Sequence, residues 1–366
     1  MNANAFLQLP PGSTGLFLEE AAAHQAAIDA TNRLFARWGY TMVHTPMVDF
    51  FEAHSHMISD DEQQRLYRMI GRDGEVLMLR SDITVFLLKH FQSLLRGAEF
   101  PVRLSYSDSI LRHEDSIDIS RNEHYQAGAE LIGTPRRDGD LEILLMLCEN
   151  LETLGILRGA LHMGSQKLFD ICFPDDGSSS GETPHQLRTH ALKAIRDRDW
   201  DELSRLSDTG RKAVKLFSSM ADAQDEETYR VMADLAAPFD GAAEELEYLA
   251  DLASTLSRYF PEMRIRIDPS EIGKRHYYSG LMFQVYLADR PYAVASGGRY
   301  DRLLAELGLD SGAVGYQVML SAIDSPAAKS GAREIRRLSD EMAQSSIETR
   351  YEAARKLREQ GGSVCL

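Results

Sequence analysis

Apolar and polar residues follow one another along the chain in patterns typical of both helices and strands. Residues 17–38 carry apolar side chains at helical spacing, and the pattern ends before Gly39, so we expect a helix there. Residues 39–50 form a strand-like run that Pro46 interrupts. Two apolar runs within 66–80 flank an Arg-Asp-Gly turn, which predicts a hairpin.

The next part of the chain predicts a helix, two long strands and a second helix. Ser81 and Asp82 precede the apolar run of residues 81–95, and both residue types are good helix caps. Residues 102–114 alternate as a strand, and the stretch 111–133 leads through a charged loop into another strand. A helix is expected at 140–155 because Gly155 ends the apolar pattern there.

The pattern then changes to charge-rich helices. Residues 185–258 read as mostly helical without strand patterning, and we interpret roughly 167–262 as an inserted helical unit. Strand signals return at 263–270, 277–288, 292–298 and 312–323, with a helix before the last of them. This order predicts an α+β fold, an antiparallel, meander-like sheet with helices on one side, and differs from the βαβ alternation of doubly wound folds.

Composition and charge narrow the function classes. The chain has 366 residues, 43% of them hydrophobic, which is enough for a large core. The formal net charge of −16 lowers the expectation of nucleic-acid binding, which favours a basic surface. No membrane-length apolar run and no secretory signal are seen, and the three widely spaced cysteines indicate neither disulfides nor a zinc site. We therefore expect a cytoplasmic protein without a metal or other cofactor.

The stretch LRHEDSIDISRNEHYQAGAELIG, residues 111–133, concentrates the candidate chemistry. Arg112 and Glu114 end its first strand, and Gln126 and Glu130 lie on its second. An arginine, an amide and carboxylates on paired strands can hold a small zwitterion or begin a reaction on it. Alone, Arg112 and Glu114 favour an ordinary surface ion pair, whereas Gln126 and Glu130 in matching register favour a pocket.

Several segments together resemble the catalytic core of histidyl-tRNA synthetases, which have a class II synthetase fold. LRSDIT resembles that family's LRPEGT, GKRHYYSG its RGLDYYTG, and SGGRYDRLL its AGGRYDGLV. The strand–loop–strand at 111–133 resembles the second class II motif, and GAVGYQVMLSAI the third. Residues 36–50 resemble the first motif, which forms the dimer interface in that family. The resemblance covers about residues 1–325.

This resemblance implies a pocket for histidine. The residues that it places there are Asp82, Thr84, Arg112, Gln126, Glu130, Tyr277 and Tyr278. Asp82 stands where the family has a glutamate for the α-amino group, although it is equally suited to capping the following helix. Tyr277 and Tyr278 are adjacent, so we expect only one, Tyr278, to face the imidazole. Arg299 and Asp301 are expected to brace the core.

Other positions depart from the synthetase pattern. The signature arginine that meets the developing phosphate charge aligns with Gly273, and the ATP-holding arginine of the third motif aligns with Ala322. Arg275 is a possible substitute partner for the carboxylate. The second-motif loop is acidic, and residues 326–366 predict a polar, helical tail without a complete anticodon-binding domain.

The sequence keeps the residues of an amino-acid pocket and departs from the synthetase pattern where ATP is held. This combination resembles the regulatory subunits of ATP phosphoribosyltransferase. That resemblance implies no catalytic residues and a self-dimer within a hetero-octamer with short-form catalytic subunits. It also implies activation of those subunits and feedback inhibition by L-histidine at the first step of histidine biosynthesis. A true histidyl-tRNA synthetase, or a related class II amino-acid ligase, is the alternative.

Overall fold

Most of the chain is described by a computed structural model. The described residues are 10, 12–13, 15–55, 58, 60–113, 122–156, 158–174, 184–273 and 277–323, with 335–337, 356 and 363–365. Arg275 and Glu114 lie outside these residues, as does most of the predicted tail.

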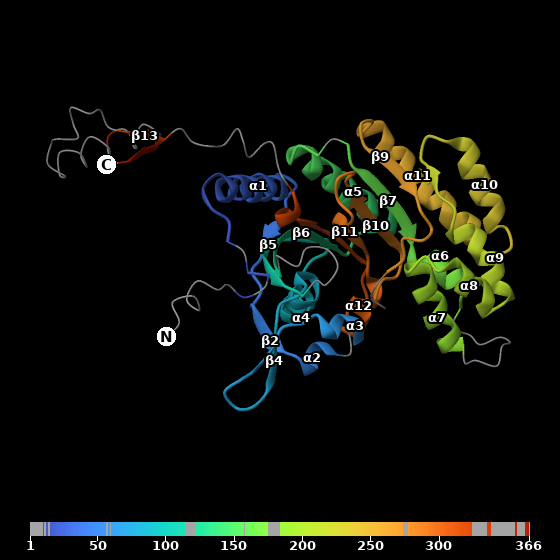
Figure 1. The fold of residues 1–366 in the computed structure, drawn as a ribbon, viewed down its shortest axis with the longest axis horizontal. Helices are drawn as coiled ribbons and strands as arrows, with labels where there is room; N and C mark the ends of the chain where they lie inside the picture. The colour runs from blue at the N-terminus through green and yellow to red at the C-terminus, as the bar shows by residue number, and fades with distance from the viewer. Residues whose placement is uncertain are drawn as a thin grey trace.

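A mixed sheet forms the centre of the molecule (Figure 1). Within the described residues it has nine strands in the order β1-β5-β6-β12-β11-β10-β7-β9-β8. Their bounds are β1 Thr41–Met42, β5 Val102–Leu111, β6 Glu123–Ile132, β7 Ala160–Ser165, β8 Ala221–Asp222, β9 Arg264–Ile267, β10 Leu281–Tyr286, β11 Ala293–Arg299 and β12 Ala313–Met319. The predicted α+β class is confirmed, and the strands fall close to the predicted runs.

Two pairs of strands correct the expected antiparallel order. β1 pairs with β5, and β7 with β9, in parallel, whereas the other pairs of the sheet are antiparallel. Parallel pairing needs a long crossover between the strands. The helices between β7 and β9 supply it for that pair, so β9 runs in the same direction as β7.

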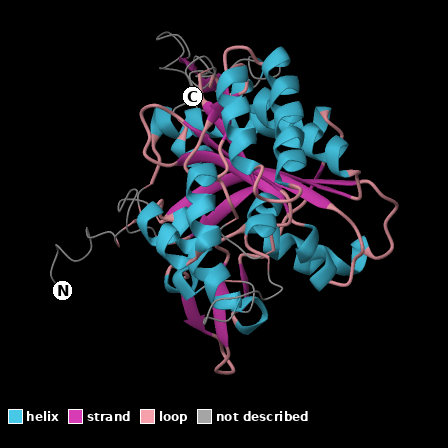
Figure 2. Ribbon diagram, turned by 90° about the vertical axis from the view of Figure 1, so that its right-hand side faces the viewer, coloured by secondary structure: helices cyan, strands magenta, loops and turns pink. Residues whose placement is uncertain are grey.

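Helices cover both faces of the sheet, which corrects the expectation of a single helical layer (Figure 2). On one face α1 (Leu18–Arg37), α5 (Arg136–Thr153) and α11 (Ala242–Tyr259) pack on the inner residues of the strands. On the other face α4 (Ile83–Leu95) and α12 (Asp301–Glu306) cover a smaller apolar cluster. The strands between them are therefore shielded on both sides, as in a layered α+β domain.

The helices α6 to α10 gather at one end of the molecule (Figure 1). They are α6 Gln166–Cys172, α7 Pro184–Arg196, α8 Trp200–Leu206, α9 Asp208–Phe217 and α10 Glu226–Ala236. The two-residue strand β8 lies between α9 and α10, a departure from the expected all-helical run. No helix among the described residues combines the length and apolar character that crossing a membrane requires.

A separate sheet of three short strands stands apart from the central one (Figure 1). β2 (Val48–Phe50) and β3 (Arg68–Ile70) flank β4 (Val76–Leu79), both antiparallel to it, which confirms the predicted hairpin. The short helices α2 (Glu52–Ser55) and α3 (Asp60–Gln64) lie between β2 and β3 in the chain. In the tail, β13 (Ile335–Arg337) and β14 (Ser363–Cys365) pair in parallel, and a 3₁₀ turn at Leu320–Ala322 follows β12.

Candidate amino-acid site

A cavity opens on the face of the sheet that α4 and α12 cover. Its volume is about 310 Å³, a value that includes space open to solvent. The residues that line it are Asp82, Thr84, Glu130, Tyr277, Tyr278, Ser296, Gly297, Gly298, Tyr300, Gly315, Tyr316 and Gln317. They come from the start of α4, from β6, β11 and β12, and from the segment before β10.

Glu130 forms the base of this cavity. It is 1% exposed, and each of its carboxyl oxygens accepts a hydrogen bond. Thr84 Oγ1 donates to Oε1 at 2.6 Å, and the Tyr300 hydroxyl donates to Oε2. Burial raises the pKa of Glu130 to about 8, with a smaller rise from the nearby Asp82, while the two hydrogen bonds act against the rise. The group is therefore a buried carboxyl that a cationic ligand would favour in its ionised form.

Glycines let other groups of the protein approach the sheet closely beside the cavity. Gly315 is paired with Glu130 in the sheet, and a Cβ at Gly315 would lie 1.7 Å from Glu130 Oε2. Gly128 lies beneath Tyr106, whose hydroxyl would be 2.4 Å from an added Cβ. At Gly298 an added Cβ would meet the carbonyl oxygen of Leu281 at 2.6 Å. Side chains at these positions would displace the cavity wall, so glycine is required by close approach here.

Asp82 has two roles in the structure. Its Oδ1 accepts a hydrogen bond from the backbone N–H of Val85 at 3.2 Å, so it caps α4 as the sequence allowed. It also lines the cavity. The capping contact fixes a carboxylate at the cavity wall, where an ammonium group would be attracted to it.

The cavity is acidic and aromatic. It is lined by Asp82, Glu130 and four tyrosines, and among the described residues no Lys or Arg lines it. Tyr277 packs on Tyr278 with ring centroids 4.8 Å apart, and edge-on against Tyr300 at 6.3 Å. Carboxylates and aromatic faces favour cationic ligands, whereas a phosphate would find no charged donor in the described wall.

Comparison with known proteins identifies the family. The family model described as Histidyl-tRNA synthetase matches residues 13–323. The chain belongs to the histidyl-tRNA synthetase family.

Relatives of this chain carry the name of a regulatory subunit. A protein of Moorella thermoacetica named ATP phosphoribosyltransferase regulatory subunit is 29% identical over 100% of this chain and 93% of its own length. A protein of the same name from Desulfitobacterium hafniense is 26% identical over 98% of this chain and 91% of its own.

Solved structures share the fold. A Bacillus halodurans protein described as an ATP phosphoribosyltransferase regulatory subunit/histidyl-tRNA synthetase superposes with a TM-score of 0.79. It is 21% identical, covering 98% of this chain and 92% of its own. The histidyl-tRNA synthetase of Nostoc superposes at 0.74 with 18% identity, covering 98% of this chain and 85% of its own. The predicted class II synthetase-like fold is thereby confirmed.

The structure brings five of the predicted pocket residues to the cavity. Asp82, Thr84, Glu130, Tyr277 and Tyr278 all line it. Both tyrosines do so, contrary to the expectation for Tyr277, because β10 begins only at Leu281 and strand alternation does not apply before it.

Two predicted residues lie outside the cavity wall, and Arg275 falls outside the described residues. Gln126 is on the same face of β6 as Glu130 and is fully buried, and its side-chain amide has no hydrogen-bond partner within the described structure. Arg112 follows β5 and donates its backbone N–H to the carbonyl of Asn122 at 2.9 Å.

Gly273 and Ala322 are the two positions that the motif resemblance matches to synthetase arginines. A Cβ at Gly273 would lie 2.7 Å from Cδ2 and 2.8 Å from Cβ of Tyr278. A side chain at Gly273 therefore requires Tyr278 to move. Ala322 is buried in the apolar core beside α1, at 6% exposure. Neither position offers a place for a guanidinium in this arrangement.

Some site residues were missed from the sequence. Tyr300 lies in the GGRYD segment between Arg299 and Asp301, and it turns to Glu130 while its neighbours turn away. Arg299 donates to Asp140 at 2.8 Å and to Asp301 at 3.0 Å, so both brace α5 as expected. The sequence held a signal for Tyr300, because a residue between Arg299 and Asp301 is expected to face the opposite way from both. The prediction considered only Arg299 and Asp301.

One group of described residues has metal-ligating side chains close together. His162, Asp268 and Glu271 are buried, with donor atoms within 4.8 Å of one another. The Asp268 carboxylate is hydrogen-bonded to His162 Nδ1 at 3.1 Å and accepts a hydrogen bond from the Ser270 hydroxyl at 2.6 Å. Glu271 accepts a hydrogen bond from the Tyr286 hydroxyl at 2.9 Å. These contacts already satisfy the group, and we assign it to holding β7 and the turn after β9 together.

Proposed function

We propose that this chain is a non-catalytic regulatory subunit of ATP phosphoribosyltransferase. In this role it activates a short-form catalytic subunit and carries feedback inhibition by L-histidine at the first step of histidine biosynthesis. One observation carries the proposal: the cavity keeps groups suited to an amino acid, while Gly273 and Ala322 stand where a synthetase needs its cations. Without such cations the transition state of adenylate formation loses its stabilisation.

The proposed ligand fits the chemistry of the wall. In this proposal Glu130 and Tyr278 would each take one imidazole nitrogen, and Asp82, at the start of α4, would attract the α-ammonium group. Arg112, Gln126 and Arg275 remain proposed contacts, of which Arg275 would meet the carboxylate. Gln126 supports this set because a fully buried amide without a partner is costly unless a ligand or water satisfies it.

The proposed partners follow from the same role. The names of the Moorella and Desulfitobacterium relatives support a catalytic ATP phosphoribosyltransferase subunit as the protein partner. We propose a self-dimer of this chain within a hetero-octamer, no cofactor, and no nucleic acid, in keeping with the net charge of −16. Cytoplasmic location suits a biosynthetic role, and Cys148 and Cys172 are both free.

Regulation in this scheme is a shift between two arrangements of the complex. Histidine binds one arrangement more tightly, and the ratio of its two affinities sets how far activity falls. The chain itself performs no bond making or breaking.

The test is a reconstitution with a short-form catalytic subunit. Turnover of ATP and phosphoribosyl pyrophosphate is measured with and without this chain, across a histidine titration. We expect the chain to raise the rate and to make it sensitive to histidine, and Glu130→Ala to remove the sensitivity but keep the activation. A rate that the chain leaves unchanged at every histidine concentration would refute the regulatory role.

A second function has support from the family match. The match to the histidyl-tRNA synthetase model favours histidine adenylation, in which histidine attacks the ATP α-phosphate, or a related class II ligase reaction. Both reactions need the cations that Gly273 and Ala322 replace. Histidine-dependent exchange of pyrophosphate into ATP by the purified chain would establish this function instead.

A further inference from the structure

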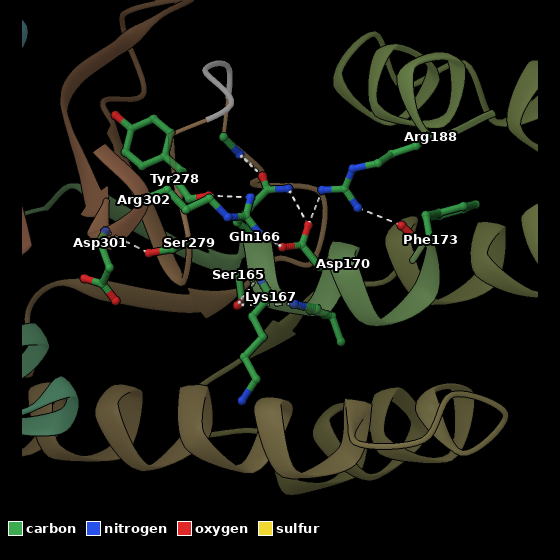
Figure 3. A network of polar contacts seen from close by, with 12 residues as sticks. Ser165, Gln166, Lys167, Asp170, Phe173, Arg188, Tyr278, Ser279, Asp301 and Arg302 are labelled. Atoms are coloured by element: carbon green, nitrogen blue, oxygen red, sulfur yellow. Dashed lines mark hydrogen bonds and ion pairs between the residues drawn. The ribbon is translucent and has the colours of Figure 1, made fainter. Parts of the chain in front are cut away.

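A single carboxylate, that of Asp170 on α6, accepts hydrogen bonds from three different elements (Figure 3). Its Oδ1 accepts from Gln166 Nε2 at 3.0 Å and from the Arg188 guanidinium at 2.5 Å. Its Oδ2 accepts from the guanidinium of Arg302 on α12. The Asp170 side chain is only 21% exposed, so these contacts are partly shielded from solvent.

Two of these three donors also hold the segment that carries the pocket tyrosines. Gln166 donates its backbone N–H to the carbonyl of Gly280 at 2.8 Å, and its Oε1 accepts from the backbone N–H of Gly273 at 3.0 Å. Gln166 thus fastens the chain on both sides of Tyr277 and Tyr278. Arg302 donates to the carbonyl oxygen of Tyr278 at 3.1 Å. The position of this cavity wall therefore depends on the groups that Asp170 orients.

The third donor lies on the next helix along the chain. Arg188 is on α7, which follows α6 within the unit that we interpret as an insertion. Its guanidinium also donates to the carbonyl of Phe173 at 2.7 Å and packs over the ring of Phe169, 4.9 Å from its centroid. Arg188 is therefore fixed in place, and a continuous series of hydrogen bonds leads from α7 through Asp170 to Tyr278.

We propose that Asp170 is a positioning residue that couples helix α7 to the amino-acid pocket. A ligand that fixes Tyr277 and Tyr278 then also restrains α7 through Gln166, Arg302 and Asp170. By linkage, whatever holds α7 raises the affinity for the ligand by the same factor. This inference rests on the proposed function, because it assumes that histidine is the ligand, and it adds a route by which the pocket and the helical unit influence each other.

The test separates coupling from stability with matched variants of the full chain. Arg188→Gln removes the contact on the α7 side and leaves the Asp170–Arg302 pair, while Asp170→Asn weakens both ion pairs. Arg137→Gln is the control, because it breaks a more exposed pair with Asp251 at 2.7 Å that does not lead to the pocket. Each variant is titrated with L-histidine by calorimetry, and hydrogen exchange of peptides from residues 184–196 is compared with and without histidine.

We expect Arg188→Gln to weaken histidine binding roughly 5- to 20-fold, within the range of about 5- to 150-fold typical of coupled sites. Histidine should slow hydrogen exchange in α7 of the wild type and of Arg137→Gln, and not in Arg188→Gln or Asp170→Asn. Arg188→Lys, which keeps the charge, should recover part of the affinity. If Asp170→Asn does not fold, the Arg188 variants and the control still decide the question.

Two outcomes would overturn different statements. If the wild type binds histidine and Arg188→Gln binds it equally well with the same exchange in α7, Asp170 is merely structural and the coupling is refuted. A lowered unfolding midpoint with unchanged histidine affinity has the same meaning. If the wild type itself does not bind histidine, the proposed function fails before the coupling is tested.

Discussion

Glu130 is the residue whose surroundings most clearly set its chemistry. Its carboxyl group is removed from water and held by two hydroxyl donors, and none of the described residues lining the cavity is a Lys or Arg that would compensate its charge. Such a group is costly when ionised and becomes favourable when a cation arrives. An imidazole that takes the proton of Glu130 would form a charge-assisted pair with it.

Replacing this carboxyl should therefore weaken ligand binding. In Glu130→Gln the shape is kept but the charge-assisted hydrogen bond is lost, which typically costs about 1.5–3 kcal/mol. We expect histidine affinity to fall roughly 10- to 150-fold in calorimetric titrations near neutral pH. Glu149→Gln is the control, since Glu149 bonds Arg37 and Trp38 on another part of the surface. Equal affinities for Glu130→Gln and wild type would place the ligand elsewhere.

The same carboxyl predicts a pH dependence of stability. Burial raises the pKa of Glu130 from 4.5 to about 8, so between these values the folded protein keeps a proton that the unfolded chain has released. The free energy of unfolding therefore falls as pH rises through this interval, by about 1.4 kcal/mol for each unit of pKa difference.

Glu130→Gln cannot ionise and should lack this contribution. In thermal unfolding without ligand, the stability of the variant relative to the wild type should rise from about pH 5 to about pH 9. The difference should be greatest at the alkaline end. Parallel curves for the two proteins across this range would mean that Glu130 does not carry a raised pKa.

At the scale of elements, the pocket depends on strands that carry glycine on one face. β6, β11 and β12 carry Gly128, Gly298 and Gly315, of which Gly298 and Gly315 line the cavity. The strands lie in the order β6-β12-β11, and other groups of the protein approach the sheet closely at each of these glycines. The cost is weaker strand packing, which α4 and α12 offset by covering this face.

A side chain at Gly315 should destabilise the fold. In Gly315→Ala the new methyl group would approach Glu130 Oε2 and the carbonyl oxygen of Ala129, so side chains and backbone must shift. We expect a loss of about 1–3 kcal/mol in urea unfolding, as for other overpacked cores. Gly97→Ala is the control, since nothing lies within 4 Å of its added Cβ, and it should be neutral or slightly stabilising. Equal midpoints for the two variants would contradict the tight packing.

How far the sequence predicts these elements depends on the physics behind each one. α1, the hairpin of β3 and β4, and the Asp82 cap were predictable because spacing, turn chemistry and capping are local. The parallel pairs of the sheet and the second helical layer were not, because they depend on which distant strands meet. The inward turn of Tyr300 and the shared facing of Tyr277 and Tyr278 also depend on tertiary contacts. Motif resemblance supplied most of the pocket, and Arg112 and Gln126 show its limit.

At the scale of the whole molecule, the three-stranded sheet presents an apolar face with no cover among the described elements. Register places five apolar residues together on that face: Val48, Phe50, Met69, Leu77 and Leu79. All are exposed or half-buried, whereas Met78 on the opposite face is buried. A contiguous apolar face of this kind is typical of a protein–protein interface. We expect it to form the proposed contact between two copies of this chain, because β2 is the end of the segment 36–50 that resembles the dimer-forming motif.

A charge placed on this face should separate the copies. Phe50 is 55% exposed, so Phe50→Asp should leave the folded protomer intact while burying an unpaired carboxylate in any interface there. We expect the dimer to weaken by about 2–4 kcal/mol, or roughly 30-fold or more, in sedimentation equilibrium. Val231→Asp on α10 is the matched control, because Val231 is also 55% exposed but lies away from this sheet, and it should remain dimeric. If Phe50→Asp sediments as the wild-type dimer, the copies must meet through another surface, and the apolar face is then free for the catalytic subunit.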